Sequence, residues 1–513
     1  MTPETLSQTL ETFLAGAGDA VVLEDGMVAF DLSQAKYSIS GETHKCLLHL
    51  WSSERNLVRR VVDLETKRDT LKLAVLRMGQ TRPSKLEICR TRDPRTPTAK
   101  RAARIAYQRM LYRVLERRFA GWKVVQLSTS VDLERSFGPV YARGLLRKGQ
   151  SAFAILGVNA QETQNSIDAA LTFGILWLNA CRESQAAKCV VEGLKLFLPA
   201  GCSTLTRERI ANLDEGAAKW GIVEFDEAID DVKEIELSDR GNMRTRLAHC
   251  LDEAVVRARF AEAIQQIYQW MPEAEPFVLS PGEIAFRHHG LEFARARMAQ
   301  EPGSLKSAPE IVFGVGAAER CLDDANTGFF QQLIRSLGEV RHATGPRDHM
   351  LWRLHPERWL ESLVVKEISA IDERLEQTAR YSQVPAFSAS DRAMIDVLSI
   401  TRDGRLAVVE LKADEDIHLP IQGLDYWARV AWHHQRGEFQ RFGYFAGREL
   451  AAETPLLFLV APSLRVHPST DILLKYFSRD IEWTVVGLDE RWREEVKVVF
   501  RKRPERTIKR AAS

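Results

Sequence analysis

Two apolar runs that each carry an acid, joined by a turn signal, constrain this chain more than any other feature. Residues 394–426 read MIDVLSITRDGRLAVVELKADEDIHLPIQGLDY. Asp396 lies in the first run, and Glu410 and Lys412 lie in the second. Nearly continuous apolar runs predict strands that are covered on both faces, where isolated acids are costly unless they are paired or bound to a metal. The segment therefore predicts a buried hairpin that contains a polar site.

The turn decides whether the two acids share a face of this hairpin. A two-residue turn at 403–404 would place Asp396 opposite Leu411, with Glu410 on the other face. A three-residue loop at 402–404, ending in a left-handed glycine, would place Asp396 opposite Glu410. We predict this loop, or a compensating bulge, because only that register brings the acids together.

The residue types at these positions suit phosphodiester hydrolysis. Mg²⁺ prefers hard oxygen ligands and is commonly held by one or two carboxylates together with waters and substrate. Glu410 and Lys412 are two apart on a strand, so their side chains point to one face. A lysine there can orient the attacking water or stabilise the phosphate in the transition state. The segment predicts the active site of a metal-dependent nuclease; the alternative is the solvent face of an amphipathic hairpin.

Motifs around this segment occur in the order helix Glu, strand Asp, strand Glu-x-Lys and helix Gln-x-x-x-Tyr. Over residues 350 to about 490 this order resembles the PD-(D/E)XK nuclease superfamily, in the style of its RecB-like and NucS-like branches. The resemblance implies a restriction-endonuclease-like mixed sheet flanked by helices, a Mg²⁺ (or Mn²⁺) cofactor, and hydrolysis by a metal-activated water that leaves a 5′-phosphate.

The resemblance also implies a role for each matching residue. Metal ligands would be Asp396 and Glu410, with Glu361 as the auxiliary acid and a further ligand. Lys412 would be the catalytic lysine, and Gln422 and Tyr426 would be the glutamine–tyrosine motif that faces the site or the DNA. The sequence departs from the family pattern at Met394, where the family often has glycine, and at the acidic residues 414–416, where the family is often basic.

The length of the chain predicts several domains, since 513 residues exceed what one core usually supports. We predict an α/β protein with two copies of the nuclease-like domain. The four expected segments are an antiparallel β-rich module (1–97), a degenerate nuclease-like α/β domain (98–240), a connector (241–345) and the nuclease domain (346–513). In the connector we expect a helix from about 244 to 270, a β-hairpin, and helices around 317–325 and 328–337.

The two α/β segments share local letters as well as the order of their elements. SAFAILGVN (151–159) aligns with RLAVVELK (405–412). The alignment pairs Arg143 with Asp396, Gly157 with Glu410, Asn159 with Lys412, Phe197 with Phe458 and Trp220 with Trp483. This pattern indicates two copies of one domain, the first without the acids. The alternative is that two α/β units share such patterns by chance.

Charge and composition limit the classes of partner that this chain can bind. The net charge is +1, so polyanion binding must come from local patches. Lysine and arginine concentrate between 82 and 118. The candidates for nucleic-acid contacts there are Arg92, Arg95, Lys100, Arg101 and Arg104. The alternative for this stretch is a solvated linker and helix face.

Seven scattered cysteines predict reduced thiols and a cytoplasmic protein, and the longest apolar run is too short to span a bilayer. We therefore expect a nuclease acting on nucleic acid, with DNA as the expected substrate and no membrane partner. The resemblance also allows a homodimer. The alternative function is a catalytically inactive nucleic-acid-binding or interaction protein that keeps the nuclease-like fold.

Overall fold

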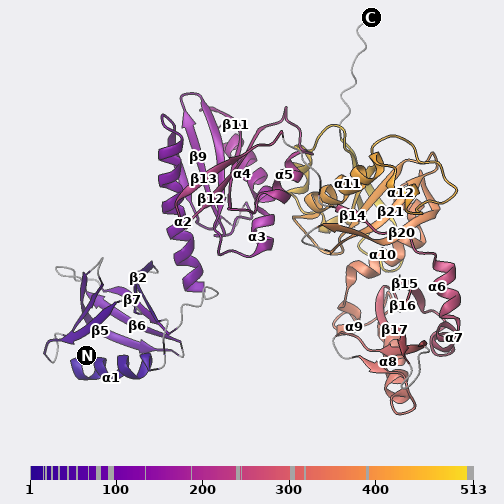
Figure 1. Ribbon diagram of the computed structural model, residues 1–513, viewed down its shortest axis with the longest axis horizontal. Coiled ribbons are helices and arrows are strands. Elements are labelled where there is room, and N and C mark those ends of the chain that lie inside the picture. Colours follow the sequence, from indigo (N-terminus) through magenta and orange to yellow (C-terminus); the bar gives the residue numbers. More distant parts are fainter. Residues whose placement is uncertain are drawn as a thin grey trace, which may run out of the picture. The chain divides into compact units, whose positions relative to one another are not determined.

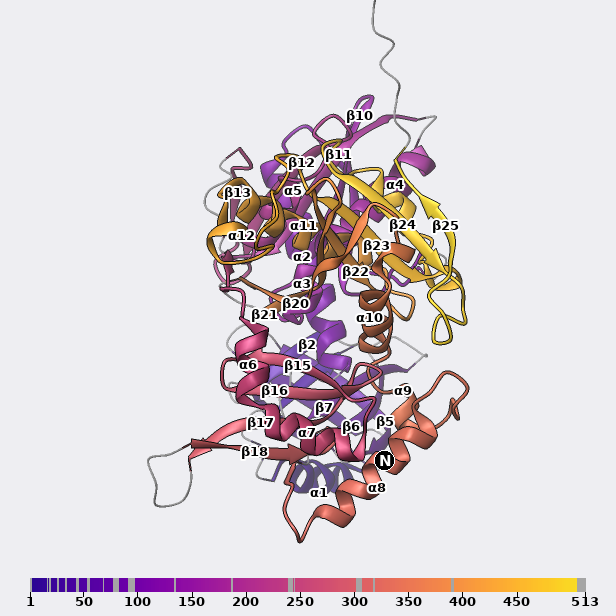
Figure 2. The same cartoon turned by 90° about the vertical axis from the view of Figure 1, so that its right-hand side faces the viewer.

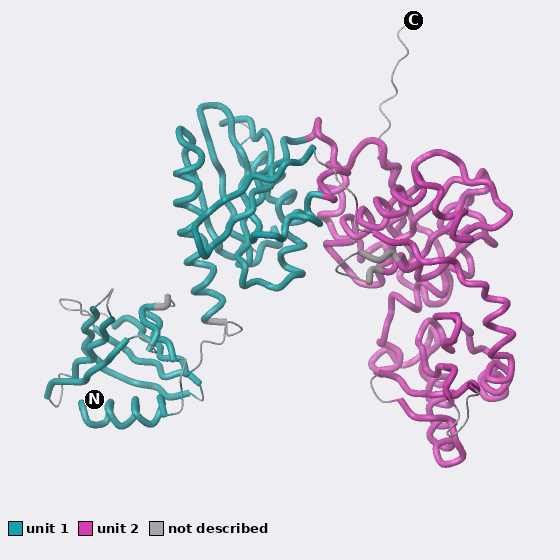
Figure 3. Tube along the Cα trace, viewed as in Figure 1, with its two compact units in different colours: residues 1–207, 218–238 teal, residues 208–217, 239–513 magenta. Residues whose placement is uncertain are grey.

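The computed structural model describes residues 2–504, except for 16, 18–19, 25–26, 33–34, 43–45, 53–55, 68, 77–82, 91–96, 133–134, 186–187, 239–242, 244, 301–306, 317–318 and 389–391. These residues form a mixed α/β protein with four β-sheets (Figure 1). Contacts divide the chain into two compact units, residues 1–207 with 218–238 and residues 208–217 with 239–513 (Figure 3).

The N-terminal sheet is antiparallel throughout, with strand order β2-β1-β7-β6-β5-β4-β3. Its strands are β1 (Val21–Glu24), β2 (Met27–Asp31), β3 (Lys36–Ser40), β4 (Leu47–Trp51), β5 (Asn56–Thr66), β6 (Thr70–Leu76) and β7 (Ser84–Cys89). Helix α1 (Pro3–Leu14) buries Leu6, Leu10 and Phe13 in the same core as these strands. The prediction of an antiparallel β module is confirmed here.

The second sheet belongs to the same unit and has the order β13-β12-β11-β10-β9-β8. Its strands are β8 (Lys123–Ser128), β9 (Tyr141–Lys148), β10 (Ser151–Val158), β11 (Val190–Pro199), β12 (Lys219–Asp226) and β13 (Asp231–Ile235), and its helices are α2 (Pro97–Arg118), α3 (Gln164–Asp168), α4 (Ala170–Gln185) and α5 (Thr204–Ile210). Pairs β10–β11 and β11–β12 are parallel, and the other pairs are antiparallel.

The third sheet, in the other unit, repeats this plan with one added edge strand, in the order β14-β20-β21-β22-β23-β24-β25. Its elements are β14 (Thr245–Leu247), β20 (Leu375–Ser388), β21 (Arg392–Thr401), β22 (Leu406–Leu411), β23 (Leu456–Pro462), β24 (Glu482–Leu488) and β25 (Val498–Lys502), with α10 (Pro356–Lys366), α11 (Leu419–Gln435), α12 (Glu438–Arg441) and α13 (Thr470–Leu474). Pairs β22–β23 and β23–β24 are parallel and the rest antiparallel, as in the second sheet.

One helix covers each face of the third sheet. Trp359 and Val364 of α10 share a core with Val409 of β22, and α10 lies beside this part of the sheet (Figure 2). Gly423 of α11 instead approaches the side chain of Leu457, which points to the opposite face. Because α11 packs on β22 and β23, those strands are buried on both sides, as their apolar runs predict.

The strand ladders give a residue-by-residue correspondence between the second and third sheets. Leu194 pairs with Ala154 and Trp220, while Leu457 pairs with Val408 and Trp483. The helix glycines agree: Gly174 of α4 approaches Leu194 and Leu196, and Gly423 approaches Leu457 and Leu459. Corresponding core positions are Ile155, Phe197 and Val223 in one sheet and Val409, Val460 and Val486 in the other.

This correspondence corrects the alignment made from letters. Arg143 still falls on Asp396, since Arg143 pairs with Leu156 and Asp396 stands opposite Glu410. Glu410 now falls on Leu156 rather than Gly157. Likewise Lys412 falls on Val158 rather than Asn159, and Phe197 falls on Val460 rather than Phe458. A shift of one or two within a run of apolar letters changes few matches, so only the hydrogen-bonded ladder fixes the register.

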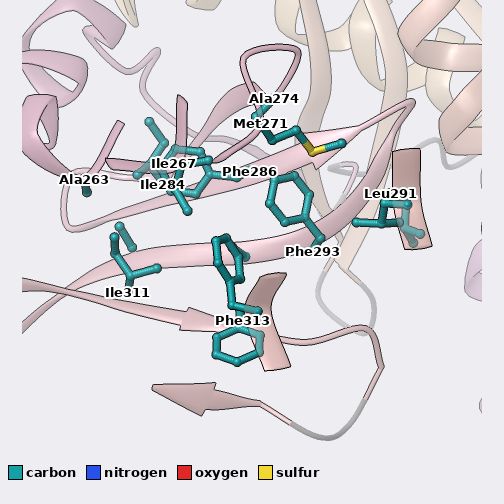
Figure 4. Close-up of a cluster of buried hydrophobic side chains, with 14 of the residues drawn as sticks. Ala263, Ile267, Met271, Ala274, Ile284, Phe286, Leu291, Phe293, Ile311 and Phe313 are labelled. Atoms are coloured by element: carbon teal, nitrogen blue, oxygen red, sulfur yellow. The ribbon is translucent and has the colours of Figure 1, made fainter. Parts of the chain in front are cut away.

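The connector contains the predicted β-hairpin within a five-stranded sheet, in the order β15-β16-β17-β18-β19, together with helices. Its elements are α6 (Glu253–Arg259), α7 (Ala261–Trp270), β15 (Glu275–Ser280), β16 (Glu283–His288), β17 (Leu291–Gln300), β18 (Ser307–Phe313), β19 (Arg320–Cys321), α8 (Thr327–Val340) and α9 (Met350–Arg353). Phe286, Phe293 and Phe313 are buried with Ile267 of α7 in one cluster (Figure 4).

Two helix predictions in the connector are wrong. The expected helix at 244–270 begins as β14, which pairs with β20, and becomes helical only at Glu253. Backbone pairing at the sheet edge outweighs local helix propensity there. Around 317–325 the described residues form β19, which pairs with β18, and a turn. The β-hairpin and the helix around 328–337 are present.

Candidate functional site

The hairpin between β21 and β22 closes with the predicted three-residue loop. The Thr401 amide donates to the Arg405 carbonyl at 2.8 Å, which leaves 402–404 as the loop. Gly404 has a φ of 84°, and a Cβ at this position would lie 2.2 Å from the Glu449 carbonyl oxygen. Both the left-handed backbone and the close approach therefore require glycine.

This loop sets the register that the acids need. Val397 pairs with Val409, so the next pair outward places Asp396 opposite Glu410 on the same face of the sheet. The Leu411 amide donates to Asp396 Oδ2 at 3.0 Å. The alternative register, with the two acids on opposite faces, is excluded. We refer to Asp396 and Glu410 as the acid pair.

Glu410 is buried, Asp396 is half-buried, and the charge of the pair is only partly compensated. Glu410 is 2% exposed; its Oε1 accepts from Lys412 Nζ at 3.3 Å, and its Oε2 is buried without a hydrogen-bond partner. Burial raises the pKa of Glu410 well above its usual range, and the neighbouring Asp396 adds to this rise. Burial, with Glu361 contributing, raises the pKa of Asp396 to about 6. Each carboxylate therefore disfavours ionisation of the other, unless a cation binds between them.

Lys412 supplies positive charge beside the acid pair. Burial lowers its pKa, but Glu410, Glu357 and Asp396 together outweigh burial and leave the pKa raised. The Glu357 carboxylate lies 3.8 Å from Lys412 Nζ. Lys412 therefore stays protonated at neutral pH.

Glu361, on α10, is buried but its carboxylate is already engaged. It accepts from Arg358 Nη1 at 2.6 Å, from Gln383 Nε2 at 3.1 Å and from the Ser382 hydroxyl. In the part of the chain that the structure describes, no group of three or more His, Cys, Asp or Glu could hold a metal ion. The centre is thus a two-carboxylate site, and a ligand role for Glu361 stays a prediction.

Helix α11 carries Gln422 and Tyr426, one turn apart, against the face that holds the acid pair. Gly423 allows the close packing, since a Cβ there would lie 2.4 Å from the side chain of Leu459. Burial raises the pKa of Tyr426, with contributions from both acids, which places the phenol near them. Gln422 Oε1 is buried without a partner.

Sequence reasoning missed the partners of Glu361. Arg358 precedes Glu361 by three residues on α10, a spacing that brings helix side chains together and that could have indicated the pair. Gln383 had no such signal, because it reaches Glu361 from β20. Arg287 of the connector donates to Gln383 Oε1 at 3.3 Å, so the connector contributes to this network.

The predicted basic patch is only partly open to a ligand. Arg104 of α2 is held by Glu162, with Nε–Oε1 and Nη2–Oε2 distances of 2.5 and 3.1 Å. Lys100 and the exposed Arg101 lie in the first turns of α2. Arg92 and Arg95 lie outside the described residues. A phosphate contact by these side chains stays a prediction.

Comparisons with known proteins identify no family. No protein-family model and no curated protein matches the chain. A crystal structure of a repair endonuclease from Pyrococcus abyssi aligns at 10% identity over 44% of this chain and 96% of that chain, with a TM-score of 0.16. A TM-score this low does not establish a shared fold, so any functional conclusion rests on the geometry of the site. No helix among the described residues is long and apolar enough to cross a membrane.

Proposed function

We propose that this chain is a metal-dependent nuclease that hydrolyses phosphodiester bonds, with DNA as the expected substrate, and that Asp396 and Glu410 hold the cation. One observation carries the proposal: the hairpin register places two carboxylates on one face and buries Glu410 Oε2 without a hydrogen-bond partner. A buried carboxylate in that condition is costly to the fold. A bound cation would remove this cost and would account for acids in two strands that are otherwise apolar.

The donor atoms fit Mg²⁺ or Mn²⁺. Two carboxylates are the protein ligands that Mg²⁺ commonly takes, with waters and substrate completing its shell. The further unpartnered oxygen, Gln422 Oε1, is also a hard donor. Zinc would favour His or Cys side chains, and the side chains that interact here are Asp, Glu, Lys and Tyr.

The residues around the acid pair would each have a separate role in the reaction. A divalent cation bound here supplies a more acidic water and neutralises charge on the phosphate. Lys412 holds a proton on Nζ, and its positive charge would stabilise the negative charge that develops on the phosphate. Arg358 is fixed by Glu361 and adds positive charge that lowers the pKa of Asp396. Gln422 and Tyr426 of α11 would face the site from that side of the sheet, where the Tyr426 phenol lies near both acids.

We further propose that the second sheet is a copy of this domain without metal chemistry, serving in nucleic-acid binding or dimerisation. The positions of Asp396, Glu410 and Lys412 are taken there by Arg143, Leu156 and Val158. Arg143 is buried and lies 4.5 Å from the Phe137 ring centroid and 5.6 Å from that of Trp177, which corresponds to Tyr426. A guanidinium enclosed by aromatic rings has no capacity to hold a cation.

The test is a cleavage assay of the full chain on plasmid, linear duplex and single-stranded DNA with Mg²⁺ or Mn²⁺. We expect cleavage that chelator abolishes, and its loss in Asp396→Asn and in Glu410→Gln, which keep the shape and remove the charge. Glu415→Gln is the matched control, because Glu415 is an exposed acid just after Lys412. Unchanged cleavage in both site variants would reject the assignment.

A catalytically inactive nucleic-acid-binding protein is the second candidate. The engagement of Glu361 by Arg358, Ser382 and Gln383 favours it, because two acids rather than three then remain as candidate metal ligands. It predicts binding of DNA by the wild-type chain with no cleavage under either metal.

A further inference from the structure

A pocket of about 460 Å³ lies just beyond the end of β22 that leads into Lys412. Its wall includes Ala413 and Asp414, which directly follow Lys412, and Pro356, which begins α10. The next residue of α10, Glu357, reaches Lys412 Nζ. Lys412 therefore connects the two sites: its side chain contacts Glu410, and the residues that follow it line the pocket.

The pocket wall is rich in arginine. Five arginines line it, against three acids. One of the acids, Glu490, accepts the Leu464 amide at 2.7 Å, and one of the arginines, Arg491, is paired with Asp489. Among the described residues, Arg347, Arg465 and Arg493 form no ion pair. We call this site, defined by these three residues, the arginine pocket.

Arg493 is the most constrained of these side chains. Its guanidinium carbon lies 4.0 Å from the ring centroid of Trp352 and 4.1 Å from that of Trp492. Nε is buried without a hydrogen-bond partner. Stacking on tryptophan fixes the plane of a guanidinium and leaves its N–H edge for a ligand. Burial lowers the pKa of Arg493 to about 10, so the group remains charged at neutral pH.

The size of the pocket limits what can bind there. Its volume falls in the range of sites for small ligands, whereas a passing strand needs an open groove. Guanidinium groups bind phosphate through paired N–H donors. A phosphate monoester carries about 1.5 to 2 negative charges at neutral pH, more than an internal diester, and so suits three unpaired arginines better.

We propose that the arginine pocket binds the terminal phosphate monoester of the nucleic-acid strand that is cleaved. This inference rests on the proposed function, because it places a strand end beside the acid pair. The enzyme would then act at a short, fixed distance from a phosphorylated end.

The test compares short duplexes and single strands that carry a phosphate or a hydroxyl at the 5′ end, and the same pair at the 3′ end. We expect at least about tenfold faster cleavage for one of the two phosphorylated ends, as charge-assisted contacts allow. Arg493→Gln and Arg347→Gln should each remove most of that preference. Arg347 is exposed, so its variant remains informative if the Arg493 variant folds poorly. Arg436→Gln is the control, an exposed arginine that stacks on Trp432 of α11.

Binding to the inactive Glu410→Gln chain separates this inference from the proposed function. The Glu410→Gln chain should bind phosphorylated ends more tightly than hydroxyl ends. If the variant that combines Glu410→Gln with Arg347→Gln loses this preference, the pocket assignment is supported even if no variant cleaves DNA. Cleavage without any preference between phosphate and hydroxyl ends would overturn the inference and leave the nuclease proposal intact. Tight binding of a free nucleoside monophosphate with no end preference would also overturn it, since the pocket would then serve a free nucleotide.

Discussion

The second and third sheets share strand order, strand direction and helix packing, yet they differ in what fills one position. In the third sheet Glu410 is buried there, with Asp396 and Lys412 half-buried beside it, whereas in the second sheet Leu156 and Val158 are buried. Burying charge is costly, and well-packed apolar residues are often as stable or more so. The second sheet shows that this architecture forms without the acids, so the fold does not require them.

The largest effect is expected from transferring the second sheet's residues to the third. We predict that Glu410→Leu combined with Lys412→Val lowers cleavage by at least about two to three orders of magnitude, as for loss of a group that stabilises transition-state charge. The free energy of unfolding should rise by about 1–4 kcal/mol, because a buried charge pair is replaced by apolar side chains. Cleavage assays and chemical denaturation measure the two effects. Lower stability together with lost activity would mean that the acid pair supports the fold.

The reverse substitution tests whether the second sheet tolerates charge at the same position. Val158 is fully buried and corresponds to Lys412, but no acid pair accompanies it. Val158→Lys should destabilise the protein by about 3–5 kcal/mol, since its ammonium group would be buried without a carboxylate. Denaturation of the full chain measures the change. A cost below about 1 kcal/mol would show that the two positions are not equivalent.

The hairpin glycines offer a matched pair. Gly404 and Gly149 both have positive φ, but an added Cβ meets the Glu449 carbonyl at Gly404 and open space at Gly149. Gly404→Ala should therefore cost about 2–4 kcal/mol and also reduce cleavage, because the loop sets the register of the acids. Gly149→Ala should cost about 1 kcal/mol and leave cleavage unchanged. Equal costs at both positions would contradict the role given to the Gly404 loop.

How far the sequence predicts this site depends on the range of the interactions. The period of two along a strand and the glycine at the end of the loop predict that Asp396 meets Glu410. Helical spacing predicts that Gln422 and Tyr426 share a face. These are local rules, and the structure agrees on the register of the two acids and places the Tyr426 phenol near them.

Features that depend on contacts between distant parts of the sequence could not be predicted in the same way. The hydrogen bonds from Ser382 and Gln383 to Glu361 depend on where β20 lies, and no sequence pattern around Glu361 indicates them. Thr245–Leu247 became a strand because β20 offered an edge to pair with. The match of Phe197 to Phe458 failed because apolar letters do not distinguish neighbouring registers.

A smaller, pH-dependent effect is expected in the unit that holds the third sheet. His289 stacks on Trp359 of α10 at a centroid distance of 5.1 Å. Burial lowers the pKa of both His288 and His289 to about 4, from an ordinary value of 6.5. The charged groups that act on the two rings are Arg341, Lys366, His342 and Glu273. The folded state thus favours the neutral rings, and the unfolded chain takes up protons first as pH falls.

Their contribution to stability should be complete above about pH 6.5 and should be lost progressively as the pH falls towards 4. Denaturation curves between pH 7 and 4 measure this. In His289→Gln the decline should be shallower, with His434→Gln on α11 as the control. An unchanged pH dependence in His289→Gln would show that the ring does not titrate as its burial implies.

The most direct measurement is anomalous diffraction from crystals of the full chain soaked with Mn²⁺. We predict one strong peak between the carboxylates of Asp396 and Glu410, its loss in Glu410→Gln, and no peak beside Arg143 and Leu156 in the second sheet. A Mn²⁺ peak elsewhere with none at the acid pair, or a peak that persists in Glu410→Gln, would contradict the claim that the two sheets differ by a metal centre.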